Sequence, residues 1–173
     1  PLQMPTNLSS PIPAQPQTTV FSTSSALVQA SAKVGTVVKG FKGSGTQQDP
    51  LLIQTVEDLM DLSRPEVGLQ GYYFRQTSDI DCSVLSSWTD ISFNGHYDGG
   101  GHYIEGRRSD ESLFNIVQSS SIKNLQLKSL SLTYSAEYSN IANCLSSNSL
   151  IVNKAKGCTI TACESNGALI FGS

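Results

Sequence analysis

Residues 141–163 read "IANCLSSNSLIVNKAKGCTITAC" and contain the same apolar pair twice. In each copy an isoleucine is followed three residues later by a cysteine, and the two isoleucines, Ile141 and Ile160, are nineteen residues apart. Nineteen residues upstream, Ile122 is followed three residues later by Leu125. A fixed interval of this length is typical of a repeat protein in which each repeat forms one structural unit.

The chain from residue 103 onward divides into successive lines of nineteen residues with no insertion. The recurring positions are Tyr103, Ile122, Ile141 and Ile160 in the first column, Gly106, Leu125, Cys144 and Cys163 in the fourth, Leu113, Leu132, Ile151 and Ile170 in the eleventh, and Phe114, Thr133, Val152 and Phe171 in the twelfth. This pattern predicts an all-β fold, a parallel β-helix whose equivalent residues stack about 4.8 Å apart in adjacent coils. The isoleucines would form an interior ladder, and Asn and Gly would supply left-handed corners between two or three short strands per turn.

Two other interpretations of the interval exist. A chance periodicity in a Ser- and Leu-rich chain would have to align four columns without a gap. A leucine-rich repeat fits Ile122, Leu125 and Leu127, which match LxxLxL, but the other lines do not repeat that motif and lack its asparagine. The solenoid explains more of the columns than either alternative.

The composition excludes several classes of function. Only 14% of the 173 residues are charged, the net charge is −3, and the pI is about 5.2. The chain therefore has no general basic field for nucleic acid. No apolar run reaches the length of about 18 residues that a membrane span requires, and no signal peptide is visible. Because Pro1 begins the chain, we interpret it as a fragment or a processed form of a longer protein.

The chain falls into two regions. Residues 1–38 are rich in Pro, Gln, Ser and Thr, contain no acidic residue, and are expected to be extended or to pack along another surface. Residues 39–173 are expected to form the β-helix domain, with an N-terminal cap at 39–75 and coils at 76–173. The C-terminal lines have the sequence of interior coils, so we expect further β-helix coils or another protein subunit to cover the coil edge at 167–172.

The cap contains one strong helix signal. Thr55 is a suitable N-cap residue, and an apolar face follows it, which predicts about two turns of helix over residues 56–62. Pro65 and Gly68 should end this helix. A strand is expected next, in the aromatic stretch 72–74.

Four cysteines stand at spacings that match no zinc motif. They are Cys82, Cys144, Cys158 and Cys163. Free cysteine is among the most buried residue types, so small core residues are the simpler interpretation, with disulfides as the alternative.

The chain resembles the GLUG-motif-containing surface proteins over about residues 41–173. That family has a GT..DP start, a short helix, a D-I-D strand, and then W..I..F.G.FDG.GH.I and LF..I....I.NL.L. The matching residues are Gly45, Thr46, Asp49, Pro50, Asp79, Ile80, Asp81, Trp88, Ile91, Phe93, Gly95, Asp98, Gly99, Gly101, His102, Ile104, Leu113, Phe114, Ile122, Asn124 and Leu125. The resemblance implies a right-handed β-helix of a secreted or surface protein, similar to adhesins and autotransporter passengers, with no catalytic residues to carry over.

The stretch "FNGHYDGGGHYIEGRRSDE" at residues 93–111 offers the best candidates for chemistry, and it also contains Arg107 and Arg108. Its candidate metal ligands or acid–base groups are His96, Asp98, His102 and Glu105. The glycine triplet after Asp98 suggests instead a tight corner, in which the carboxylate bonds the turn backbone and the glycines take positive φ. We therefore predict that these residues are structural, and we assign no catalytic, cofactor-binding or metal-binding residue.

Two weaker candidates remain outside this stretch. Asp79 and Asp81 flank Ile80 on a predicted strand, so both carboxylates would share one face and could form a weak calcium site or a solvated surface. Trp88 would fill the widest coil, or else be exposed as an anchor for a glycan.

Two classes of function therefore remain. The first is a non-enzymatic extracellular or cell-surface module for adhesion, display or assembly, whose partner would be a host-cell protein or a glycan. The second is a carbohydrate-active β-helix enzyme, such as a polysaccharide lyase or glycosidase, or a fragment of one. Beyond residue 112 the only acidic residues are Glu137 and Glu164, so the coils lack the carboxylate cluster that the enzyme would need. This favours the module, with no cofactor.

Overall fold

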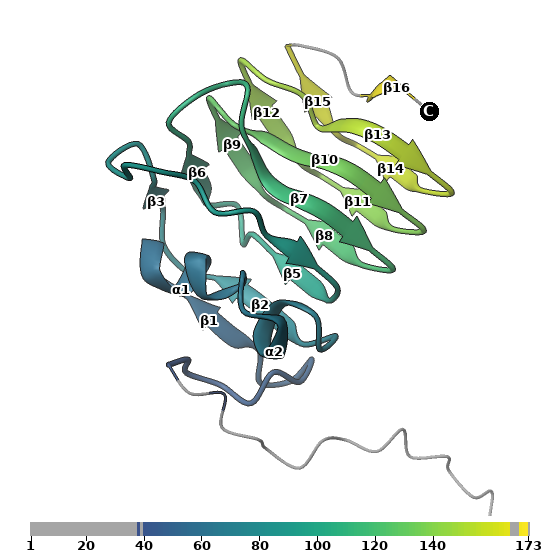
Figure 1. The fold of residues 1–173 in the computed structure, drawn as a ribbon. Helices are drawn as coiled ribbons and strands as arrows, with labels where there is room; N and C mark the ends of the chain where they lie inside the picture. Colours follow the sequence, from purple (N-terminus) through teal and green to yellow (C-terminus); the bar gives the residue numbers. More distant parts are fainter. Residues whose placement is uncertain (1–37, 39, 167–169, 173) are drawn as a thin grey trace, which may run out of the picture. The chain divides into compact units, whose positions relative to one another are not determined.

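The computed structural model describes residues 38, 40–166 and 170–172 (Figure 1). The expected extended segment 1–38 lies outside the described residues except for Val38, which is buried against Phe41 and the rest of the core. The predicted coil edge at 167–172 is described only for the backbone of β16 (Ile170–Gly172). None of the helices in this part of the chain is long and apolar enough to cross a membrane.

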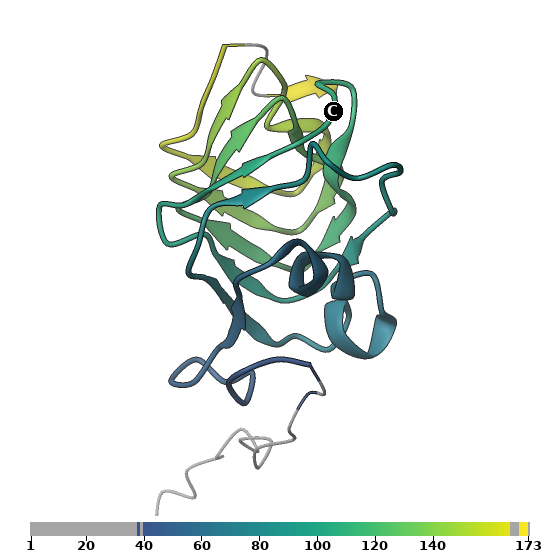
Figure 2. The ribbon, with the colours of Figure 1, turned by 90° about the vertical axis from the view of Figure 1, so that its left-hand side faces the viewer.

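The protein is a right-handed parallel β-helix built from three sheets, as the nineteen-residue interval predicts (Figures 1 and 2). Sheet A contains β1 (Leu51–Ile53), β2 (Tyr73–Gln76), β5 (His96–Asp98), β8 (Ser121–Lys123), β11 (Asn140–Ala142) and β14 (Thr159–Thr161). Sheet B contains β3 (Ile80–Asp81), β6 (Tyr103–Glu105), β9 (Gln126–Lys128), β12 (Leu145–Ser147) and β15 (Glu164–Ser165). Sheet C contains β4 (Ser92–Phe93), β7 (Ser112–Gln118), β10 (Ser131–Glu137), β13 (Val152–Lys156) and β16.

Three left-handed corners in each regular turn separate its three strands. Residues with positive φ recur at the same places in successive turns: Ser119, Tyr138 and Gly157 after sheet C, Asn124, Asn143 and Ala162 after sheet A, and Ser129 and Asn148 after sheet B. Asparagine and glycine were expected at these corners, whereas serine, tyrosine and alanine were not. A left-handed backbone costs such residues about 1–2 kcal/mol each. The parallel ladders on either side of every corner offset that cost.

The predicted interior ladder is confirmed. Ile141 pairs with Ile122 on one side and with Ile160 on the other. The fourth-column residues Leu125 and Cys144 are also buried, and the Cys144 backbone N–H donates to Cys163 Sγ at 3.5 Å. All four cysteines are free thiols, two of them buried and two half-buried, which agrees with the simpler of the two interpretations.

The nineteen-residue register fails in the turn before Ile122. Its partner in sheet A is Tyr97, twenty-five residues upstream, and Tyr103 pairs instead with Gln126 in sheet B. The extra six residues lie in two corners of this turn: four residues join β5 to β6 and six join β6 to β7, whereas two residues fill each equivalent gap in the next turn. The predicted placement of Tyr103 and Gly106 in the first and fourth columns is therefore wrong. The eleventh and twelfth columns hold from β7 to β13, because Phe114 pairs with Thr133 and Thr133 pairs with Val152.

The last turn is one residue short. Ile170 pairs with Val152 at an interval of eighteen, so it occupies the twelfth column and not the predicted eleventh. The shortening follows β15, because Ser165 still pairs with Ser146 at nineteen, whereas Asn166 Oδ1 accepts a hydrogen bond from the Asn148 N–H, eighteen residues away.

The glycine triplet between β5 and β6 has two separate roles. Gly100 and Gly101 have φ values of 62° and 82°, as the predicted corner requires. Gly99 does not have positive φ, but a Cβ there would lie 2.5 Å from Asn124 O and 2.7 Å from Leu125 Cα. Glycine is needed at that position because the coil passes directly over the backbone of the next one.

The N-terminal turn replaces two strands with helices. α1 (Val56–Asp61) follows β1, and Thr55 caps it as predicted, in a reciprocal pair of hydrogen bonds with Asp58. A second helix, α2 (Pro65–Gly68), was not expected. Pro65 begins that helix and does not simply end α1, because proline fits the first helical position, where its missing N–H costs nothing. The Gly68 carbonyl then accepts from Asn94 N–H at 2.7 Å, so α2 lies against the end of β4.

The interior ladder predicts that substitutions of two neighbouring residues of β11 have very different effects on the free energy of unfolding. Ile141 is fully buried and Asn140 is exposed. We expect Ile141→Ala to lower the free energy of unfolding by about 2–5 kcal/mol, measured by urea denaturation. The control Asn140→Ala should change it by less than about 0.5 kcal/mol. Equal effects of the two substitutions would contradict the ladder.

Candidate functional site

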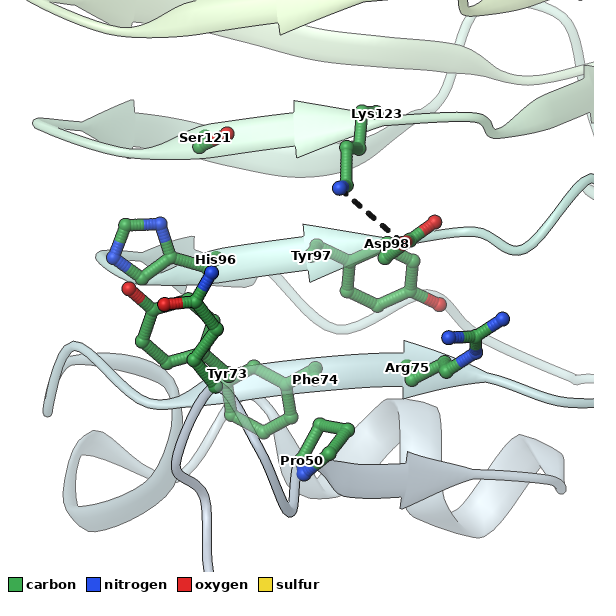
Figure 3. Close-up of a pocket in the computed structure, with 10 residues that line it drawn as sticks. Pro50, Tyr73, Phe74, Arg75, His96, Tyr97, Asp98, Ser121 and Lys123 are labelled. Atoms are coloured by element: carbon green, nitrogen blue, oxygen red, sulfur yellow. Dashed lines mark ion pairs between the residues drawn. The ribbon is translucent and has the colours of Figure 1, made fainter.

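A groove of about 410 Å³ lies on the outer face of sheet A (Figure 3). We call it the sheet A groove. It is lined by Gln47, Pro50, Tyr73, Phe74, Arg75, His96, Tyr97, Asp98, Ser121 and Lys123. Three adjacent strands, β2, β5 and β8, supply most of these residues, and the loop before β1 supplies the remaining two.

Strand alternation explains which side chains reach the groove. Phe74, Tyr97 and Ile122 occupy the central position of their strands, and their side chains are buried in the core. Their neighbours along each strand point outward. The parallel register then aligns these neighbours in two outward rows. One row contains Tyr73, His96 and Ser121, and the other contains Arg75, Asp98 and Lys123.

An aromatic pair forms one wall of the groove. The rings of Tyr73 and His96 stack with centroids 4.0 Å apart and an interplanar angle of 16°. Burial lowers the pKa of His96, so its imidazole is neutral near pH 7. The next residue in the row, Ser121, is small, and it leaves space beside the imidazole in Figure 3. The pair therefore brings aromatic carbon and polar ring atoms to one wall of the groove.

The opposite row carries charge. Lys123 Nζ lies 3.5 Å from Asp98 Oδ2. Asp98 Oδ1 accepts from the Gly100 N–H at 3.0 Å and from Asn124 Nδ2 at 2.9 Å. Burial alone would raise the pKa of Asp98, but the hydrogen bonds from Asn124 and Gly100 and the charge of Lys123 outweigh it, so the pKa is lowered. Asp98 is thus a fixed carboxylate that organises the corner, as predicted.

Arg75 is the groove's available cation. Its side chain is exposed, and among the described residues no carboxylate lies within ion-pairing distance of its guanidinium. Asp98 is its neighbour in the register, but the bonds of Asp98 go to Asn124, Gly100 and Lys123. The groove therefore has two cations and one anion in a protein whose net charge is −3.

The other candidates from residues 93–111 do not join this group. His102 Nδ1 lies 3.2 Å from Asp79 Oδ1, which also accepts from the Tyr103 N–H at 3.1 Å. Glu105 belongs to sheet B, where it pairs in register with Asp81. Within the described residues no set of three or more His, Cys, Asp or Glu side chains is arranged to hold a metal ion. That these residues have no catalytic role stays a prediction.

A second hollow, of about 260 Å³, lies beside sheet C, and Trp88 lines it together with Asp90, Asp110, Glu111 and Tyr134. Trp88 is half-buried and packs against the core, which agrees with its predicted filling role. Each of two carboxylates there contacts an arginine: Glu111 pairs with Arg107, and Asp110 pairs with Arg108 at 3.0 Å.

Sequence reasoning identified Asp98 and His96 but missed Tyr73, Arg75 and Lys123 as their neighbours. The partners lie 23 and 25 residues away, outside the nineteen-residue register. A usable signal was the similarity of the triplets "YFR", "HYD" and "SIK", each with one central apolar residue between two polar or aromatic ones.

No protein-family model and no curated protein matches the chain. Among solved structures, the fold is similar to the crystal structure of a "putative immunoglobulin A1 protease" from Bacteroides ovatus, with a TM-score of 0.56 and 18% identity. The match covers 73% of this chain and 49% of the other, so this chain spans about half the length of that protein. At this identity the likeness shows the fold alone. The β-helix implied by the resemblance to GLUG-motif proteins is present, and membership of that family stays a prediction.

The hydrogen bonds of Asp98 predict a pH-dependent contribution to stability. Because its pKa is lower in the folded than in the unfolded chain, the contribution is present above the unfolded value of 3.8 and disappears as pH falls through the folded value. At pH 7, Asp98→Ala should lower the free energy of unfolding by about 1–3 kcal/mol. The difference from the parent protein should shrink below about pH 4.

The matched control is Asp110→Ala, since that carboxylate is exposed and pairs only with Arg108 in the described structure. It should change the free energy of unfolding by less than about 1 kcal/mol. A difference between parent and Asp98→Ala that stays constant from pH 7 to pH 2 would show that the ionised carboxylate does not organise this corner.

Proposed function

We propose that this protein is a non-enzymatic β-helix module of a secreted or cell-surface protein, and that it binds a ligand through the sheet A groove in adhesion, display or assembly. The observation that carries the proposal is the groove itself. Its stacked aromatic pair and its free cation, Arg75, form a binding surface, while its one carboxylate, Asp98, is committed to the corner.

The arrangement of acidic side chains supports binding over catalysis. Acid–base cleavage of a glycosidic bond needs two carboxyl groups that face the same bond and remain free to transfer protons. The sheet A groove offers one carboxylate, and it is already hydrogen-bonded. The hollow beside Trp88 has more acidic residues, but Arg107 and Arg108 neutralise two of them. The carbohydrate-active enzyme is therefore the second candidate, and that hollow is where it would act.

The last coil is a second surface for partners in this proposal. Among the described residues, β14 and β15 are the final strands of sheets A and B. Ile160 and Cys163 are half-buried there, whereas their counterparts Ile141 and Cys144 are buried. Further β-helix coils or another protein subunit stacked on this edge would bury the columns and pair the open backbone groups.

The resemblance to surface proteins supports an extracellular or cell-surface location. The partner recognised by the groove would be a host-cell protein or a glycan.

The proposal predicts binding without turnover. The protein, incubated at high concentration with immunoglobulin A1 and with a panel of acidic and neutral polysaccharides, should yield no new fragment by mass spectrometry. It should nevertheless be retained on a surface coated with at least one polysaccharide of that panel. Tyr73→Ala should weaken that retention. Fragments produced by the parent protein but not by Glu111→Gln would overturn the non-enzymatic assignment and favour the second candidate.

A further inference from the structure

The sheet A groove has a chemical character that narrows the choice of ligand. One wall presents the Tyr73 and His96 rings, and the other presents Arg75 and Lys123 (Figure 3). A guanidinium recognises a carboxylate through parallel hydrogen bonds, and an exposed one without an ion-pair partner is available for that contact. The ligand for such a groove should combine carboxylate groups with a face that packs against aromatic rings.

Strand addition by a peptide is not available in this groove. β5 is hydrogen-bonded to β2 on one side and to β8 on the other, and β2 and β8 are themselves paired on both sides. The sheet therefore has no open edge along the groove, and a peptide could not gain the main-chain hydrogen bonds of β-augmentation. Recognition must come from outward side chains, which in the two rows are mainly hydroxyl, ring, amide and charged groups.

The two rows continue along the solenoid. After Ser121, the row that begins with Tyr73 continues with Asn140 and Thr159 in the next coils. Successive coils are about 4.8 Å apart, so polar groups recur at short, regular steps along one line. This geometry suits a linear polymer of hydroxyl-bearing units better than a single compact molecule.

We propose that the sheet A groove binds an acidic oligosaccharide, with a sugar ring against Tyr73 and His96 and a sugar carboxylate against Arg75. This inference rests on the proposed function, because it names the ligand of the same site. Lys123 supplies a second cation beside Asp98, and the neutral imidazole of His96 avoids adding a third charge to the aromatic wall.

The test compares three probes by isothermal titration calorimetry with the full chain. They are an oligogalacturonate of about six units, its fully methyl-esterified form, and poly-glutamate of similar charge. The oligogalacturonate should bind, with affinity falling as salt rises. The methyl ester keeps the rings and loses the charge, and it should bind at least tenfold more weakly. Poly-glutamate keeps the charge and lacks the rings, and it should also bind at least tenfold more weakly.

The variants locate the contact. Arg75→Gln and Tyr73→Ala should each weaken oligogalacturonate binding at least tenfold, while both variants still unfold cooperatively. Arg75→Lys should recover part of the loss in Arg75→Gln, because the charge returns without the planar fork. Lys154→Gln is the control, since it removes an exposed cation from sheet C, where Lys154 Nζ lies 5.1 Å from the Tyr134 ring centroid, and it should leave binding unchanged.

Each outcome separates the inference from the proposed function. Equal binding of poly-glutamate and oligogalacturonate, or equal loss with Lys154→Gln and Arg75→Gln, would reduce the effect to net charge and overturn the inference. Binding of a neutral oligosaccharide that is lost in Tyr73→Ala would keep the groove as a binding site and reject the acidic ligand. Absence of oligogalacturonate binding would also reject the inference. If the Tyr73→Ala variant is retained on the polysaccharide-coated surface as well as the parent protein is, the groove is not the binding site. The proposed function then fails as well.

Discussion

The in-register stacking of each coil on the next is the constraint on which the rest of this structure depends. All the strand pairings are parallel, and each strand of sheets A, B and C lies over its counterpart in the neighbouring turn. Because side chains alternate between the two faces of a strand, a slip of one residue would turn an apolar column outward. The register therefore fixes both the core and the left-handed corners, where serine, tyrosine and alanine accept an unfavourable backbone conformation.

The sheet A groove is a consequence of the same stacking. The positions that flank the buried column form two outward rows, and in the N-terminal coils those rows contain rings and charges instead of small polar side chains. Tyr73 and His96 stack because the register places them side by side, and the ladder on both sides holds their backbones in place. As a proposed binding surface, the groove needs no loop to close over a ligand. The specificity of such a surface would lie in which residues occupy the outward rows.

The sequence predicted the regular part of the fold well and the irregular part poorly. The Ile122, Ile141 and Ile160 ladder followed from the interval alone, because a buried column must repeat with the coil. The position of Tyr103 could not be predicted in this way, since corners tolerate inserted residues that leave the strands paired. The corner role of Asp98 was visible in the glycines after it. Its neighbours Arg75 and Lys123 were not, because the coils that bring them together differ in length by the corner insertions.

The most direct test of the stacking constraint is a pair of deletions whose junction lies inside a sheet C strand. Removal of residues 133–151 takes out nineteen residues and joins Leu132 to Val152, so each column continues in register. Removal of residues 134–151 takes out eighteen, joins Thr133 to Val152, and places two inward-facing residues of the same column in succession. The measurement is cooperative thermal unfolding followed by circular dichroism. Stacking predicts that the nineteen-residue deletion unfolds cooperatively at a lower temperature than the parent and that the eighteen-residue deletion loses much more stability. Equal stability of the two deletions would contradict the account.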